Sequence, residues 1–164
     1  MTTFAGRYWR AHEARTTPGC VQQPRIPFAI AATRPRSLRV AARHAAVWVS
    51  SGPRSHTDPP LPAAEGAAAI ARQLARLEDA CAAEGRDPAT LDRLVVTGPL
   101  LDGGLRSLDA FREVRDAYAA IGITDLVVHW PRASEPYAGD EAILDEIADS
   151  REQSGPGRPR PGCG

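Results

Sequence analysis

The turn "AATRPR" at residues 31–36 carries the side chains best suited to chemistry, because Arg34 and Arg36 flank Pro35 directly after an apolar run. Proline suits the first turn of a helix, where its missing N–H is not needed. The free amides and the positive end of such a helix favour an anion. Every Lys or Arg position of this chain is Arg and Asn is absent, a bias typical of GC-rich coding DNA, so a surface arginine without a binding role is the competing interpretation.

Other familiar catalytic sets cannot be assembled. The sequence holds no Ser-His-Asp or Cys-His set, no Walker motif and no GxGxxG. His44 and His56 have no visible catalytic partner. The three cysteines are widely spaced and form no CxxC pair, so we expect reduced thiols and no metal site.

Size and charge narrow the class of partner. The 164 residues fit one domain, and the net charge of zero argues against a nucleic acid or an anionic membrane surface. No signal peptide and no apolar run of membrane-spanning length is visible, so we expect a soluble, cytoplasmic protein. A small-molecule ligand or a protein partner is then expected.

The elements that must position these residues follow a repeating pattern. Short apolar runs alternate with stretches of helical spacing, which predicts four βα units and a parallel sheet. Continuous apolar character favours strands covered on both faces. The expected strands are residues 27–32, 45–51, 93–98 and 125–130, and the helices start at Pro35, near Ala63, after a Ser107 cap and at Asp140.

Three segments are predicted along the chain. Residues 1–26 lack a clear period and are interpreted as an extended arm that belongs on a larger body, against which Tyr8 and Trp9 would be buried. Residues 27–150 hold the βα units. Residues 151–164 are rich in Gly, Pro and Arg, and we expect a disordered tail.

Several phrases resemble the luciferase-like flavin-dependent monooxygenases and their deazaflavin-dependent relatives. "FAGRYW", "PGCVQQPRIP" and "LRVAARHAAVW" are similar, in this order, to that family's "FxGxxY", "PxPVQxPxxP" and "LRLAARHADGW". "ACAAEGRDPATLDRLVVTG" resembles its "EEAGRDP" passage, and "AYAAIGITDLVVHWP" its "AGVD" entry into the closing strand. The resemblance covers nearly everything from Phe4 to about Ser150.

The resemblance implies a fold. Family members are (β/α)8 barrels about twice this length, so the match implies an α/β chain that holds strands five to eight and lacks strands one to four. Such a half-barrel has two open sheet edges. We therefore expect it to be marginally stable, inactive, or paired as a homodimer through those edges.

The resemblance also implies a cofactor site. In the family, the turn matching "AATRPR" resembles "GGxGP" or "AATGP" and holds the cofactor phosphate, which Arg34 or Arg36 could pair directly. Arg34 occupies the place of a glycine; if positive φ is needed there, strain of order 1 kcal/mol follows. Ser50 and Ser51 could bind phosphate or ribityl oxygens, or simply finish the strand. The implied cofactor-binding residues are Ala32, Thr33, Arg34, Arg36, Ser50 and Ser51, and the cofactor is FMN or the deazaflavin coenzyme F-420.

Strand four ends near a further candidate group. His129 and Trp130 precede Pro131 and Arg132, so one of the pair points into the barrel mouth, and His129 and Arg132 are candidates to line a substrate. Rim positions are the alternative. The catalytic residues stay unknown, because in the family they lie largely on the early strands.

Two functions fit these features. The first is a truncated luciferase-like oxidoreductase, whose intact relatives use reduced flavin or deazaflavin to act on a small organic substrate. The alternative is a non-enzymatic α/β module that binds a phosphate ligand or a protein.

Overall fold

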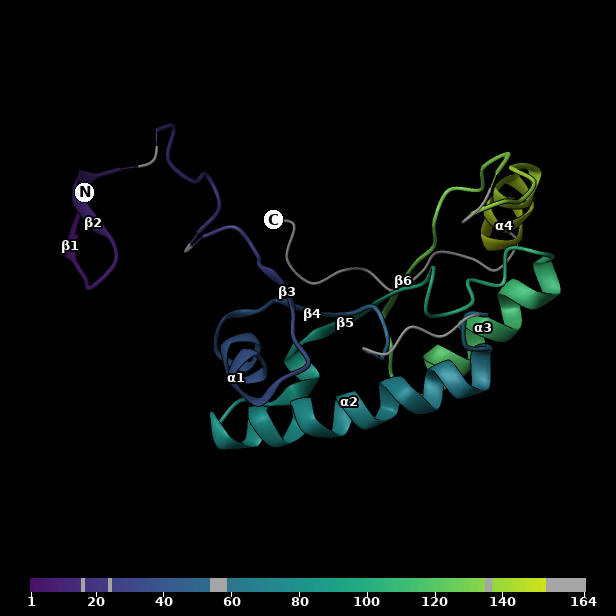
Figure 1. Cartoon of the computed structure of the whole chain (residues 1–164), viewed down its shortest axis with the longest axis horizontal. Helices are drawn as coiled ribbons and strands as arrows, with labels where there is room; N and C mark the ends of the chain where they lie inside the picture. The colour runs from purple at the N-terminus through teal and green to yellow at the C-terminus, as the bar shows by residue number, and fades with distance from the viewer. Residues whose placement is uncertain (16, 24, 54–58, 135–136, 153–164) are drawn as a thin grey trace.

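The computed structural model describes residues 1–15, 17–23, 25–53, 59–134 and 137–152 (Figure 1). Two short strands precede a series in which strands and helices alternate. The elements are β1 (Thr2–Ala5), β2 (Arg10–Ala14), β3 (Ala29–Ala31), α1 (Pro35–His44), β4 (Val47–Ser50), α2 (Ala63–Ala83), the 3-10 turn η1 (Pro88–Thr90), β5 (Asp92–Val96), α3 (Leu108–Ala120), β6 (Asp125–Val127) and α4 (Ala142–Glu152).

The sheet confirms the predicted fold class. Strands β3, β4, β5 and β6 pair in parallel in chain order, and each connection between them contains a helix. Consecutive strand order with helical crossovers is the arrangement of part of a (β/α)8 barrel. Figure 1 shows α1, α2 and α3 on one side of this sheet, and successive helices of the series pack against each other.

The core lies between the sheet and these helices. Trp48 and Val95 of the sheet are fully buried against Ile70 and Leu77 of α2, and the buried cluster extends to Tyr118 of α3. The Trp48 indole N–H donates to the Ala32 carbonyl at 2.8 Å, which satisfies the one polar atom of a large buried ring. The helical spacing predicted from the sequence is therefore confirmed for α2 and α3.

One face of the sheet lacks the cover that was expected. Ala29 and Ala31 of β3 are exposed, and Val127 of β6 is 41% exposed. The expectation that the first strand is covered on both faces was wrong, because the described helices occupy only one face. The strand is also shorter than the apolar run that predicted it.

The N-terminal arm forms a small antiparallel hairpin, in which Phe4 pairs with Ala11. Figure 1 shows this hairpin standing apart from the parallel sheet. Tyr8 and Trp9 at its turn are 76% and 81% exposed, so the described part of the chain does not supply the surface that was expected to bury them. The predicted tail, residues 151–164, begins within α4, and residues 153–164 lie outside the described residues.

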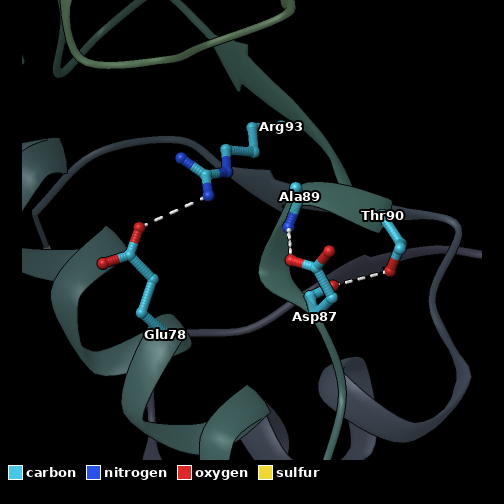
Figure 2. Close-up of polar contacts among 5 residues, drawn as sticks. All are labelled: Glu78, Asp87, Ala89, Thr90 and Arg93. Atoms are coloured by element: carbon cyan, nitrogen blue, oxygen red, sulfur yellow. Dashed lines mark hydrogen bonds and ion pairs between the residues drawn. The ribbon is translucent and has the colours of Figure 1, made fainter.

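Local caps explain the bounds of several elements. Pro35 occupies the first turn of α1, and the Ser107 hydroxyl accepts from the Ala110 amide at 3.2 Å, as predicted. After α2, Gly85 adopts a φ of +67°, a conformation that costs glycine little. Figure 2 shows Asp87 capping η1 by accepting from the Ala89 amide at 2.9 Å.

The phrase "EGRDP" after α2 has a structural role. The Arg86 guanidinium donates to the carbonyls of Ala42 and Ala45 at 3.0 and 2.8 Å, and so holds the C-terminal end of α1. Figure 2 also shows the Glu78 carboxylate of α2 paired with Arg93 of β5 at 3.3 Å. Arg86 therefore fastens the loop after α2 to α1, and the Glu78–Arg93 ion pair fastens α2 itself to β5.

Candidate functional site

The loops that follow the four parallel strands lie at one end of the sheet, because the carboxyl ends of parallel strands share an edge. They begin after Ala31, Ser50, Val96 and Val127. The candidate residues of the sequence fall into these loops and onto the starts of the helices that follow. Within the part of the chain that the structure describes, no helix is long and apolar enough to cross a membrane.

The turn between β3 and α1 is unstrained. Arg34 is the N-cap of α1 with φ −105° and ψ 154°, an extended conformation open to any residue. The strain that positive φ would have imposed on Arg34 is therefore absent. Its amide donates to the Ser37 hydroxyl at 3.2 Å, and that hydroxyl donates back to the Arg34 carbonyl at 3.0 Å. The next amides of α1 lack intrahelical acceptors, as at every helix start.

A groove of about 680 Å³ lies between this turn and α2. Arg34 lines it together with Arg72 and Arg76, and none of its described lining residues is acidic. We call it the arginine groove; the residues that line it are Thr33, Arg34, Pro35, Pro53, Ala69, Arg72, Gln73 and Arg76. Three arginines and the N-terminal turn of α1 contribute to this lining, and both kinds of group favour an anion.

Two of these arginines were missed from the sequence. Arg72 and Arg76 are four residues apart and so lie on one flank of α2. Their spacing was visible, but the approach of that flank to the turn after β3 is a tertiary feature. Arg76 Nε donates to the Arg72 carbonyl at 3.2 Å, which ties one guanidinium along the helix.

Arg36 lies elsewhere. It lines a separate hollow of about 230 Å³ on the exposed side of α1, with Arg39, Arg43 and His44. Arg34 and Arg36 are thus not brought together. Arg43 forms an ion pair with Glu84, which holds the pKa of that carboxyl below its usual value.

Ala32 and Ser50 serve the fold. The Ala32 amide donates to the Val49 carbonyl at 3.4 Å, and its own carbonyl accepts from Trp48. Ser50 is buried, and its hydroxyl donates to Gln73 Oε1 at 2.6 Å. Gln73 Nε2 donates to the Gly52 carbonyl at 2.9 Å, and the Gly52 amide donates to Ser50 Oγ at 3.2 Å. This closed triangle fixes the chain after β4.

Ser51 and His129 are brought together. They line one cavity of about 290 Å³ at the ends of β4 and β6, whose walls are otherwise mainly apolar. Ser51 is exposed, in contrast to its neighbour Ser50, because successive strand residues point to opposite faces. A few polar side chains in a mainly apolar lining are the groups that orient a small ligand.

His129 is held by its ring. It stacks on Tyr137, with ring centroids 4.2 Å apart and planes 19° apart. Gly98, at φ +150°, allows this position, because a Cβ there would lie 2.4 Å from His129 Nε2. Trp130 is 62% exposed, so His129 is the member of the pair that faces a cavity.

The same histidine lines a larger cavity of about 630 Å³ between the loops after β5 and β6. Asp102 and Arg106 line it as an ion pair, with Asp102 Oδ2 and Arg106 Nη1 2.6 Å apart, and Asp140 and Glu146 add acidic groups. This mixed charge suits a neutral polar ligand better than an anion. Arg132 is not among the lining residues; its guanidinium lies 5.6 Å from the Tyr137 ring centre.

The remaining titratable groups offer little chemistry. Burial raises the pKa of the Cys81 thiol, which keeps it protonated and inert. Among the described residues, no group of three or more His, Cys, Asp or Glu side chains is placed to hold a metal ion.

Comparison with known proteins decides the family. The model of the luciferase-like monooxygenases matches residues 1–152. The chain belongs to the luciferase-like monooxygenase family. A solved structure of an F420-dependent secondary alcohol dehydrogenase in complex with an F420-acetone adduct is similar to this chain, with 11% sequence identity and a TM-score of 0.49. The match covers 77% of this chain and 49% of that chain, so this family member spans about half the length of that protein. No curated protein matches the present chain.

Proposed function

We propose that this chain is the cofactor-binding portion of a luciferase-like oxidoreductase that acts on a small organic substrate. In this proposal the arginine groove takes the phosphate of a reduced flavin or deazaflavin. The carrying observation is that Arg34, Arg72 and Arg76 line one groove at the start of α1, with no acidic residue among its described lining. The cytoplasm, where reduced cofactors are kept, is the proposed location.

The groove fits a phosphate for two reasons. A helix N-terminus and guanidinium groups both favour a dianion, and arginine presents paired donors to phosphate oxygens. The backbone of Arg34 is extended and unstrained. The arginine that stands where the family has a glycine therefore adds a positive charge to the groove without a cost in backbone strain. Thr33 belongs to the same groove.

The residues near His129 are proposed to meet the substrate. The isoalloxazine or deazaflavin ring supplies the redox chemistry when bound. In this chain, Ser51 and His129 offer hydrogen bonds from the lining of a mainly apolar cavity, and the Tyr137 stack fixes the imidazole plane. These groups orient a ligand and exclude water around it.

The test is a fluorescence titration with reduced and oxidised FMN, and with the deazaflavin coenzyme F420. Riboflavin, which lacks the phosphate, is the matched ligand control. We expect saturable binding of one phosphorylated cofactor, and weaker binding of riboflavin by about tenfold or more, the value of a charge-assisted contact. Equal affinity for riboflavin and FMN would contradict a phosphate site.

Two variants locate the phosphate. Arg34→Gln removes a guanidinium from the arginine groove and should weaken the cofactor by about tenfold. Arg36→Gln removes the same charge two residues away, in the separate hollow on α1, and should leave affinity nearly unchanged. A larger loss for Arg36→Gln than for Arg34→Gln would place the phosphate elsewhere.

A non-enzymatic phosphate-binding module is the second candidate. The same cationic groove favours it, because nothing in that lining is specific to a flavin ring. Competition with inorganic phosphate separates the two. Displacement by phosphate of a ligand that lacks any ring would support the module, whereas a requirement for the ring supports the oxidoreductase.

A further inference from the structure

The parallel sheet ends in two unpaired edges. β3 and β6 each have one strand neighbour among the described residues, so each presents a free row of backbone groups on its outer side. The helices follow the same order, with α1 and α4 at opposite ends of the row (Figure 1). One end of the structure therefore consists of β3 and α1, and the other of β6 and α4.

These two ends carry opposite charge. Within α1, Arg36, Arg39 and Arg43 are exposed and the helix contains no acidic residue; Arg43 is paired with Glu84, so Arg36 and Arg39 carry the excess positive charge. Among residues 140–150, every exposed charged side chain is acidic. The acidic residues there are Asp140, Glu141, Asp145, Glu146 and Asp149. The net charge of the whole chain is zero, so this separation is invisible in the composition.

Exposed apolar side chains also gather at both ends. Ile26 and Phe28 precede β3, and Val127 and Trp130 lie in and after β6; all four are more than two-fifths exposed. Val40 lies exposed within the arginines of α1. Apolar groups beside a free strand edge and surrounded by charge are typical of a surface that another protein covers.

We propose that the occupant of both ends is a second copy of this chain, docked head to tail. In this dimer the β6 edge of each copy lies beside the β3 edge of its partner, and each acidic α4 packs against a basic α1. Two copies then supply eight parallel strands, the number at which a closed barrel is just filled by its own side chains. Each copy's open sheet face becomes part of the barrel interior.

Charge selects this arrangement over the simplest alternative. Pairing of like edges, β3 with β3, would bring two basic α1 helices together, and β6 with β6 would bring two acidic α4 regions together. Like charges across an interface disfavour such pairs, whereas opposite charges fix the register and speed association. Head-to-tail contacts between two copies close into a ring only when one copy is rotated by a half turn relative to the other. Four strands make half of an eight-stranded barrel, so two such copies are related by this half turn.

The experiment measures mass in solution by light scattering and by sedimentation. Variant A carries Arg36→Glu and Arg39→Glu, so both ends become acidic. Variant B carries Glu141→Arg, Asp145→Arg and Asp149→Arg, so that arginines outnumber the acidic residues left at the α4 end and both ends become basic. We expect the wild type to be a dimer at micromolar concentration, and each variant alone to dissociate at least about tenfold more readily. An equimolar mixture of A and B should form a heterodimer, because both contacts then unite opposite charges.

A combined variant controls for misfolding caused by the substitutions themselves. The chain with all five reversals has an acidic α1 end and a basic α4 end, so it should dimerise like the wild type, while circular dichroism checks the helix content of every variant. A monomeric wild type overturns the proposal, and so does variant A or B that dimerises as tightly as the wild type. A mixture of folded A and B that stays monomeric also overturns it. A monomer that instead captures a separate four-stranded half-barrel would identify a different occupant.

Discussion

The hydroxyl of Tyr118 on α3 lies directly against the backbone of α2 at Gly66. A Cβ built on Gly66 would stand 2.5 Å from this oxygen and 3.2 Å from Leu101 Cδ2. Tyr118 is 1% exposed, and its hydroxyl is the buried side-chain polar atom without a hydrogen-bond partner among the described residues. The close contact of α2 and α3 therefore depends on a glycine and includes an unsatisfied donor.

The first prediction concerns this contact. Gly66→Ala should lower the free energy of unfolding by about 1–2 kcal/mol, because the overpacking outweighs the higher helix propensity of alanine. Tyr118→Phe should raise it by about 1 kcal/mol, since a buried hydroxyl without a partner is removed. Urea denaturation monitored by circular dichroism measures both changes.

The double variant tests the cause. When Phe replaces Tyr118, the atom nearest to the new Cβ is gone, so Gly66→Ala should cost much less in that background. Tyr8→Phe, at an exposed tyrosine, is the matched control and should change nothing. Additive costs in the double variant would show that the hydroxyl is not the obstacle.

The second prediction is a loss of stability in alkali. Burial raises the pKa of Tyr118 to about 12, from an ordinary value of 10. Between these pH values the unfolded chain releases the phenolic proton and the folded chain keeps it. Stability is therefore full below pH 10 and falls as pH rises, by on the order of 2 kcal/mol up to pH 12. Denaturation midpoints across this range should fall less for Tyr118→Phe than for the wild type; parallel slopes would contradict the assignment. Cys81, whose pKa is also raised, contributes equally to both proteins.

The third prediction separates two neighbouring serines. Ser50→Ala removes the donor that satisfies Gln73 Oε1 and should cost about 1–3 kcal/mol of stability. Ser51→Ala changes an exposed hydroxyl and should alter stability by less than about 0.5 kcal/mol. If the proposed ligand cavity is correct, Ser51→Ala weakens ligand binding instead. The reverse order of stabilities in urea would show that the triangle with Gly52 does not hold the loop.

Much of the fold was predictable because apolar residues recur at helical spacing on the buried face of each helix. Ile70, Leu74 and Leu77 recur at helical spacing and are buried as expected. Coverage of the sheet was not predictable in this way. An apolar run such as that around Ala29 shows what the side chains prefer, but not whether the chain supplies a layer to cover them. The exposure of Trp9 has the same cause, because the described part of the chain supplies no layer to cover its indole ring.

The candidate site was predictable only in part. Pro35 marked the start of α1, and Arg34 beside it lines the arginine groove. Arg34 and Arg36 separate because residues two apart on a helix point in roughly opposite directions, a signal that was available. The contribution of Arg72 was not available, because it depends on how α2 packs against α1.

The last prediction concerns Gly98 and the position of His129. A Cβ at residue 98 would lie 2.4 Å from His129 Nε2, and the φ of +150° is unfavourable for alanine. Gly98→Ala should therefore push the imidazole off the Tyr137 ring and cost roughly 1–3 kcal/mol of stability. The imidazole proton resonances report the displacement, since a ring stacked at 4.2 Å is shifted upfield by its neighbour. Tyr137→Leu, which removes the neighbouring ring without crowding, is the matched comparison and should produce the same downfield change with an unstrained Gly98. Unchanged imidazole resonances in Gly98→Ala would mean that His129 does not rest against residue 98, and its place between the two cavities would have to be reassigned.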